Sequence, residues 1–92
     1  MAVQAMSGDD AEKIAIAGLA FLAENPDHLA RFLAATGIGP ETLRAAAADP
    51  AFLAGILEFL MSDDSLLVEF AERQRLRPTL IAIAHHRLDP GE

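Results

Sequence analysis

The chain has 92 residues, of which 52% are hydrophobic, and a formal net charge of −7. This length suits one domain with a single modest core, and the absence of cysteine excludes disulfides and thiolate zinc sites and fits a cytoplasmic location. The acidic balance disfavours nucleic acid as a partner, because binding to phosphates draws on clustered positive charge.

We expect one helical domain over residues 1–92, with residues 1–8 flexible and residues 89–92 forming a tail. No apolar run approaches the roughly 20 residues that a membrane span needs. We therefore expect no contact with a membrane.

Proline marks the start of most predicted helices. It follows a capping residue in Asn25-Pro26 and Asp49-Pro50, and each pair precedes a helical pattern. Proline suits the first helical position because its missing N–H would be unpaired there, and the side-chain oxygen of Asn or Asp caps the same end. The pattern predicts no strand and six helices, at residues 9–24, 26–36, 40–48, 50–61, 63–74 and 78–88.

The predicted helices differ in how their apolar residues are distributed. Helix 63–74 has one apolar stripe, whereas helix 50–61 is apolar on nearly all sides and carries Glu58 as its only charge. Helix 9–24 also departs from the single-stripe pattern. Such helices are either surrounded by others in a compact six-helix all-α domain or shared with a second copy. The second alternative predicts a homodimer through helices 9–24 and 50–61.

An offset of 38 residues aligns the two halves of the chain without a gap. The matched pairs include Phe21 with Phe59, Asn25 with Asp63, and Phe32 with Phe70. The segments FLAENPDHLARFLAATGIGPETLRAAA and FLMSDDSLLVEFAERQRLRPTLIAIAH then look like two copies of one three-helix unit. Chance also gives some such matches in a chain rich in Ala and Leu. Two such units would pack about a pseudo-two-fold axis, each completing the core of the other.

The stretch Gly37-Ile38-Gly39-Pro40 resembles the hairpin of a helix-hairpin-helix nucleic-acid-binding element. In that hairpin, glycines let backbone N–H groups approach a phosphate at a helix N-terminus. The aligned stretch of the second half keeps neither glycine, and the first half offers Glu41 where a lysine or arginine would serve the phosphate. We therefore favour an architectural role, with Gly37 as the left-handed cap of helix 26–36, Ile38 packed back on that helix, and Gly39 capping the next one.

Two blocks of the chain, and the spacing between them, resemble a small family of bacterial proteins of unknown function, typical of alphaproteobacteria. The blocks are AEKIAIAGLAFLAENPDHLARFLAATG and LRAAAADPAFLAGILEFLMSDDSLLVEF, and the resemblance runs from about Ala11 to Ala71. Its most specific element is DPAFLAGILEFLMSDD, residues 49–64. The ending RQRLRPTLIAIAHHRLDPGE resembles the family least. The resemblance implies a compact helical domain and carries no catalytic residue over to this chain.

Catalytic and metal-binding candidates are few. His85 and His86 are adjacent and point about 100° apart on a helix, so they cannot chelate one ion from one face. His85 with Asp89 supplies two ligands where a metal site needs three or four. Asp63 and Asp64 are paired carboxylates suited to acid–base chemistry, yet at a helix start they serve as cap and dipole partner. We expect no enzyme activity, no cofactor and no metal.

The basic segment near the C-terminus is the most informative surface feature. Arg73, Arg75 and Arg77, with Arg87 nearby, stand in a stretch without acidic residues. The end of a helix accounts for some of this charge, but four arginines exceed what its dipole needs. They suit docking to an acidic protein partner or to an acidic face of a second copy of the chain. We expect a non-catalytic, cytoplasmic protein-interaction module; the alternative is phosphate-backbone binding through Gly37, Ile38 and Gly39 assisted by the same arginines.

Overall fold

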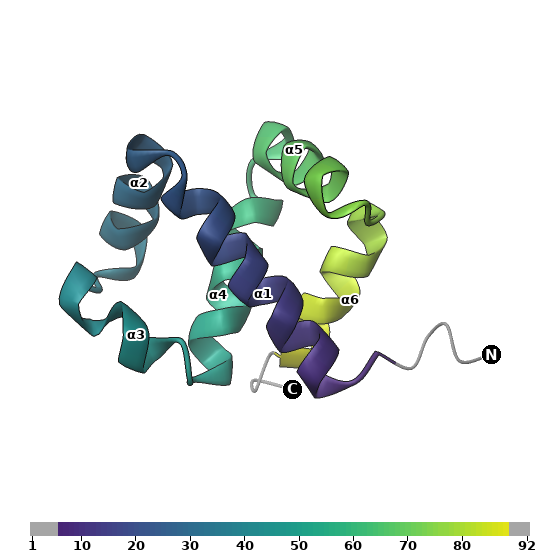
Figure 1. Ribbon diagram of the computed structural model, residues 1–92, viewed down its shortest axis with the longest axis horizontal. Helices are drawn as coiled ribbons and strands as arrows, with labels where there is room; N and C mark the ends of the chain where they lie inside the picture. Colours follow the sequence, from purple (N-terminus) through teal and green to yellow (C-terminus); the bar gives the residue numbers. More distant parts are fainter. Residues whose placement is uncertain (1–5, 89–92) are drawn as a thin grey trace.

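The structure is a computed structural model and describes residues 6–88 (Figure 1). The described part is all-α, as predicted. Its elements in chain order are α1 (Gly8–Ala23), α2 (Pro26–Thr36), the 3-10 turn η2 (Pro40–Thr42), α3 (Leu43–Ala46), α4 (Pro50–Met61), α5 (Asp64–Gln74) and α6 (Pro78–Leu88). Most of the N-terminal segment expected to be flexible, and the expected tail 89–92, lie outside the described residues. Between residues 6 and 88, no helix has the length and apolar composition needed to cross a bilayer.

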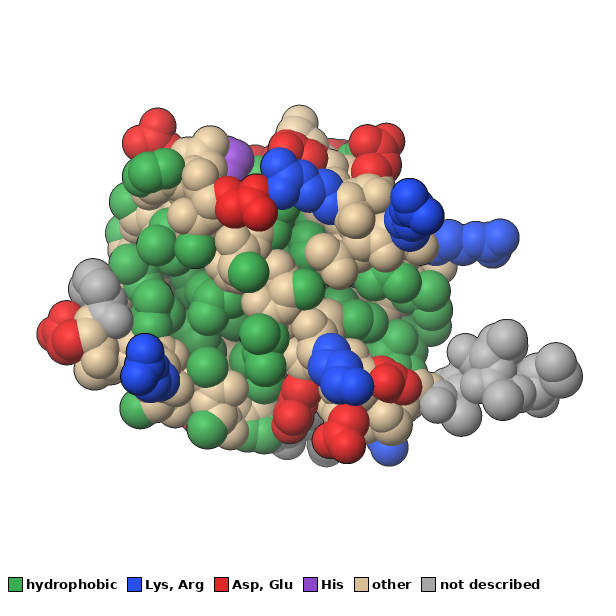
Figure 2. All heavy atoms as spheres, viewed as in Figure 1, with side chains coloured by type: hydrophobic (Ala, Val, Ile, Leu, Met, Phe, Trp, Pro, Cys, Tyr) green, Lys and Arg blue, Asp and Glu red, His purple; other side chains and the backbone are tan. Residues whose placement is uncertain are grey.

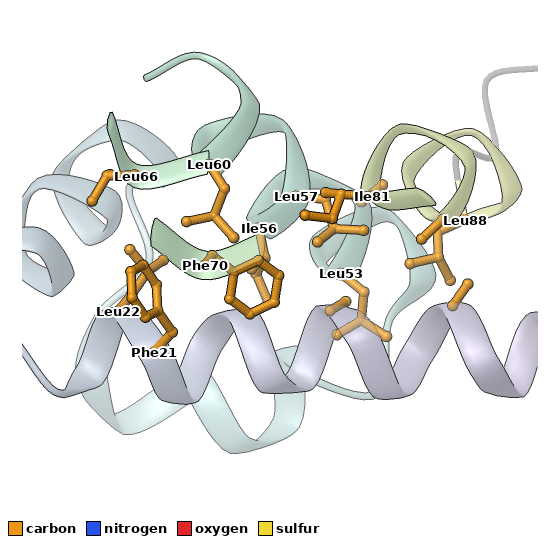
Figure 3. Packing of buried hydrophobic residues seen from close by; sticks show 14 of the residues in the cluster. Phe21, Leu22, Leu53, Ile56, Leu57, Leu60, Leu66, Phe70, Ile81 and Leu88 are labelled. Carbon is orange, nitrogen blue, oxygen red and sulfur yellow. The ribbon is translucent and has the colours of Figure 1, made fainter. Parts of the chain in front are cut away.

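Helix α4 forms the centre of the molecule. Helices α1, α2, α5 and α6 all pack on it. The side chains that these helices turn toward one another form a single hydrophobic core (Figure 3). Leu53, Ile56, Leu57 and Leu60 of α4 are each no more than 1% exposed. Burial by the other helices of the same chain therefore accounts for the apolar character of α4. This agrees with the first of the two alternatives, a helix surrounded by others in one domain.

Helix α1 packs on both α4 and α6, so the first and last helices of the described chain are neighbours. Gly18 lies where α1 crosses α4. A Cβ built on Gly18 would stand 3.0 Å from Leu60 Cδ1 and 3.2 Å from Ile56 Cγ2. The missing side chain thus lets the two helices approach closely.

The predicted caps open the helices as expected. Asn25 Oδ1 accepts hydrogen bonds from the backbone N–H groups of Asp27 and His28, at 3.0 and 3.4 Å. Asp49 Oδ1 accepts the N–H of Ala51 at 2.9 Å. Helices α2, α4 and α6 begin and end at the predicted residues, and the bounds of α1 and α5 differ from prediction by one residue.

The third predicted helix, 40–48, is wrong in its extent. The chain instead forms the 3-10 turn η2 and a single helical turn, α3. Thr42 precedes α3 but its side chain makes no capping hydrogen bond, and its hydroxyl donates to the carbonyl of Gly39 at 2.9 Å. Gly39 directly precedes the 3-10 turn, and its carbonyl accepts the N–H of Thr42 at 3.1 Å, so it begins a shorter helical segment than the predicted one. Alanine favours helix but buries little area, and a short helix without strong packing is marginal.

Two helices end in left-handed residues that stand 38 positions apart. Gly37 after α2 has φ 76°, and its N–H donates to the Leu33 carbonyl at 2.8 Å. Arg75 after α5 has φ 57°, and the Leu76 N–H donates to the Ala71 carbonyl at 2.9 Å, which closes a Schellman motif. The cap predicted at Gly37 is confirmed, and Ile38 packs against the core as expected. The second end adopts the same conformation without a glycine.

We expect Arg75→Gly to raise the free energy of unfolding by about 0.5–1 kcal/mol, because an L-residue is strained in the left-handed region and glycine is not. Urea denaturation followed by circular dichroism measures the change. Gly37→Ala is the matched control at the other left-handed end, and it should lower stability by about 1 kcal/mol. A loss of stability in Arg75→Gly would show that the arginine side chain supports the fold.

Several local features follow the 38-residue offset. Helices α2 and α5 match end to end, and the caps Asn25 and Asp63 each accept two backbone N–H groups at matched positions. The ring centroids of Phe21 and Phe70 are 5.5 Å apart, and those of Phe32 and Phe59 are 5.4 Å apart. The offset aligns Phe21 with Phe59 and Phe32 with Phe70, so it relates one of these ring pairs to the other. The third helices differ, since α3 has one turn and α6 has eleven residues. The internal repeat stays a prediction.

Candidate functional site

The predicted basic site centres on the connection between α5 and α6. Arg75 occupies the left-handed cap of α5, and Arg77 immediately precedes the first residue of α6. Both are exposed. The ion pairs found among residues 6–88 involve neither of them. We call Arg75 and Arg77 the connection arginines.

Arg73 belongs to the same stretch of sequence but is already engaged. Its Nη1 donates to Oε1 of Glu24, the residue that ends α1. Its guanidinium also lies over the ring of Phe21, 5.4 Å from the ring centroid. Arg73 therefore ties α5 to the end of α1, and it adds less free charge to the site than the sequence indicated.

Arg87 is separated from the connection arginines. It lies in the last turn of α6, ten residues after Arg77, which corresponds to about 15 Å along the helix. The structure thus keeps Arg75 and Arg77 in one connection and leaves Arg87 at the opposite end of α6.

A small polar cavity lies next to the contact between Arg73 and Glu24. Its volume is about 200 Å³, and it lies among α1, α2 and α5; its lining residues are Phe21, Glu24, Asn25, His28, Glu69 and Arg73. No sequence pattern groups these residues, because they come from three separate helices. Asn25 already caps α2 and Arg73 already binds Glu24, so much of the lining has a structural task.

The glycine hairpin lies far from the basic site. Figure 1 places the connection between α2 and α3 and the connection between α5 and α6 at opposite ends of the molecule. A Cβ built on Gly39 would stand 3.0 Å from both carboxylate oxygens of Glu41. The carboxylate of Glu41 therefore lies against the hairpin, and its negative charge would disfavour a phosphate there. The phosphate-binding alternative requires the hairpin and the arginines to lie on one surface. They do not.

Two of the remaining candidates, Asp63 and His85, have partners within the chain. Asp63 caps α5 by accepting the N–H groups of Ser65 and Leu66 at 3.0 and 3.2 Å, and its Oδ2 lies 3.8 Å from Arg31 Nη2. His85 Nε2 lies 3.9 Å from Oε1 of Glu58 on α4. Asp89, its proposed companion ligand, lies outside the described residues. Within residues 6–88, no group of three His, Cys, Asp or Glu side chains is placed to hold a metal ion.

Comparison with known families agrees with the resemblance seen in the sequence. The model of the family described as "Protein of unknown function (DUF3572)" matches residues 8–91, which is nearly the whole chain. The chain belongs to this family. The match includes α6 and the basic stretch, which the sequence resemblance had left out. No curated protein and no solved structure shows significant similarity to this DUF3572 member.

Proposed function

We propose that this DUF3572 protein is a non-catalytic protein-interaction module that binds an acidic surface through the connection arginines. The observation that carries the proposal is the backbone of Arg75. A non-glycine residue held at φ 57° costs stability, and glycine would fill the same position without strain. An exposed arginine at such a position supports a role for the side chain outside the fold.

The net charge of the chain and the position of the two arginines also support this role. The chain is acidic overall, with a net charge of −7, so an exposed arginine pair stands out against its surroundings. Arg75 and Arg77 are separated by one residue in a connection that rigid helices hold at both ends. Fixed positive groups on an acidic protein steer an acidic partner to one end of the molecule and fix its orientation.

The test compares proteins captured from native lysate, in the presence of nuclease, by wild type and by the double variant Arg75→Glu, Arg77→Glu. Quantitative mass spectrometry should show at least one acidic partner that the double variant loses. The matched control is Arg44→Glu, which reverses an exposed arginine on α3, and it should retain that partner. Identical partners for wild type and the double variant would refute the proposal.

The strain at Arg75 supplies a second control. Arg75→Gly is expected to be more stable than wild type, yet it should bind the captured partner more weakly. This combination would separate lost binding from lost folding. If Arg75→Gly binds as tightly as wild type, Arg75 is not part of the contact.

A further inference from the structure

Helix α1 has an apolar face on each side. Ala11, Ala15, Gly18 and Leu22 point into the core and are buried. On the opposite side Ile16 is 50% exposed and Ala20 is exposed as well. A helix that covers a core usually presents charged or polar residues to solvent, and Ile16 is one of the two large hydrophobic residues found exposed between residues 6 and 88.

This outer face is bounded by opposite charges. Positions 13, 16, 20 and 24 are three or four residues apart and therefore lie along one side of the helix. Lys13 stands near its N-terminal end and Glu24 at its C-terminal end, with Ile16 and Ala20 between them. We call these four residues the α1 seam. Figure 1 shows α1 crossing the front of the molecule, and Figure 2 shows hydrophobic side chains spread over that face.

We propose that the α1 seam binds the α1 seam of a second copy of this chain in antiparallel orientation. The positions of Lys13 and Glu24 have their midpoint at 18.5, and those of Ile16 and Ala20 at 18. A two-fold axis near this midpoint sets Lys13 opposite Glu24 of the partner subunit and Ile16 against Ala20 of the partner subunit. Each contact occurs twice, as an isologous interface requires.

The two charged residues of the seam differ in how far they are already engaged. The ion pairs found between residues 6 and 88 do not include Lys13. Glu24 binds Arg73 through Oε1, but its side chain remains 56% exposed, which leaves Oε2 to accept from the lysine. Ala20 is small enough for two helices to approach closely over it. Reversing one copy thus places opposite charges against each other at both ends of the seam and apolar residues against each other between them.

The proposal concerns a different surface from the connection arginines and does not depend on them. It retains α1 from the homodimer predicted by the sequence and omits α4, whose apolar residues the chain itself buries. A seam of three turns is small beside the roughly 800 Å² per partner of a stable interface. We therefore expect a dimer that dissociates on dilution.

Sedimentation velocity over a range of protein concentrations tests the inference. Wild type should pass reversibly from monomer to dimer as concentration rises. Ile16→Asp places a charge in each half of the seam and should raise the dimer Kd by at least about tenfold. Ala20→Glu, which keeps a good helix former, should act in the same direction. Circular dichroism of each variant confirms that it is folded.

Val68→Asp is the matched control. Val68 is 49% exposed, nearly as much as Ile16, but it lies on α5. Its replacement should leave the Kd unchanged within about twofold. Three results would overturn the inference: a wild type that is monomeric up to its solubility limit, a dimer that both seam variants preserve, or equal weakening by Val68→Asp and Ile16→Asp.

Discussion

Phe70→Ala is expected to lower the free energy of unfolding by about 3–5 kcal/mol, the usual cost of deleting a buried aromatic ring. Phe70 is 0% exposed, and its ring centroid lies 5.5 Å from that of Phe21. The ring also faces Gly18, where neighbouring helices leave little freedom to collapse into a cavity. Against a total of about 5–15 kcal/mol for a native domain, this loss leaves the variant barely folded.

Urea denaturation monitored by circular dichroism measures the loss, with Val68→Ala as the control on the same helix. Val68 is 49% exposed, so its truncation should change stability by less than about 0.5 kcal/mol. A cost below about 1 kcal/mol for Phe70→Ala would contradict the description of one tightly packed core around α4. It would indicate that α5 is only loosely attached.

Gly18→Val is expected to lower the free energy of unfolding by about 1–3 kcal/mol, because the site is already filled by its neighbours. A Cβ alone would stand 3.0 Å from Leu60 and 3.2 Å from Ile56, and valine adds two further methyl groups. Relief requires α1 to move away from α4, which would also disturb its contact with α6.

Gly55→Ala is the matched control for this substitution. Gly55 lies inside α4, and a Cβ there would meet nothing within 4 Å. Alanine should therefore raise stability by about 0.5–1 kcal/mol through its better helix propensity. Thermal unfolding of both variants separates the steric effect of a side chain at position 18 from the effect of helix propensity at position 55. A stable Gly18→Val protein would mean that the crossing of α1 and α4 tolerates expansion.

The starts of α2 and α4 were predictable because they depend on neighbouring residues. A side-chain oxygen on Asn25 or Asp49 and a proline after it determine where a helix begins. The extent of α3 was not predictable in this way. Its alanines favour helix, but whether they continue it depends on packing that the local sequence does not report.

The candidate site was harder to predict because its contacts join distant parts of the chain. The hydrogen bond from Arg73 to Glu24 spans 49 residues, and no local pattern indicates it. The left-handed conformation of Arg75 lacks the glycine that usually signals it. The 38-residue offset aligns Arg75 with Gly37, and this alignment was the feature of the sequence that indicated the conformation. By contrast, the sequence alone indicates that Arg75 and Arg77 share one connection, because a single residue separates them.

The contact between α1 and α6 has a consequence for synthesis of the protein. A ribosome adds about 5–20 residues per second, so the first residue of α6 follows the first residue of α1 by about 4–14 s. During that interval the inner face of α1 lacks α6, one of the helices that pack on it. The nascent chain therefore cannot complete the core described here until α6 has been synthesised.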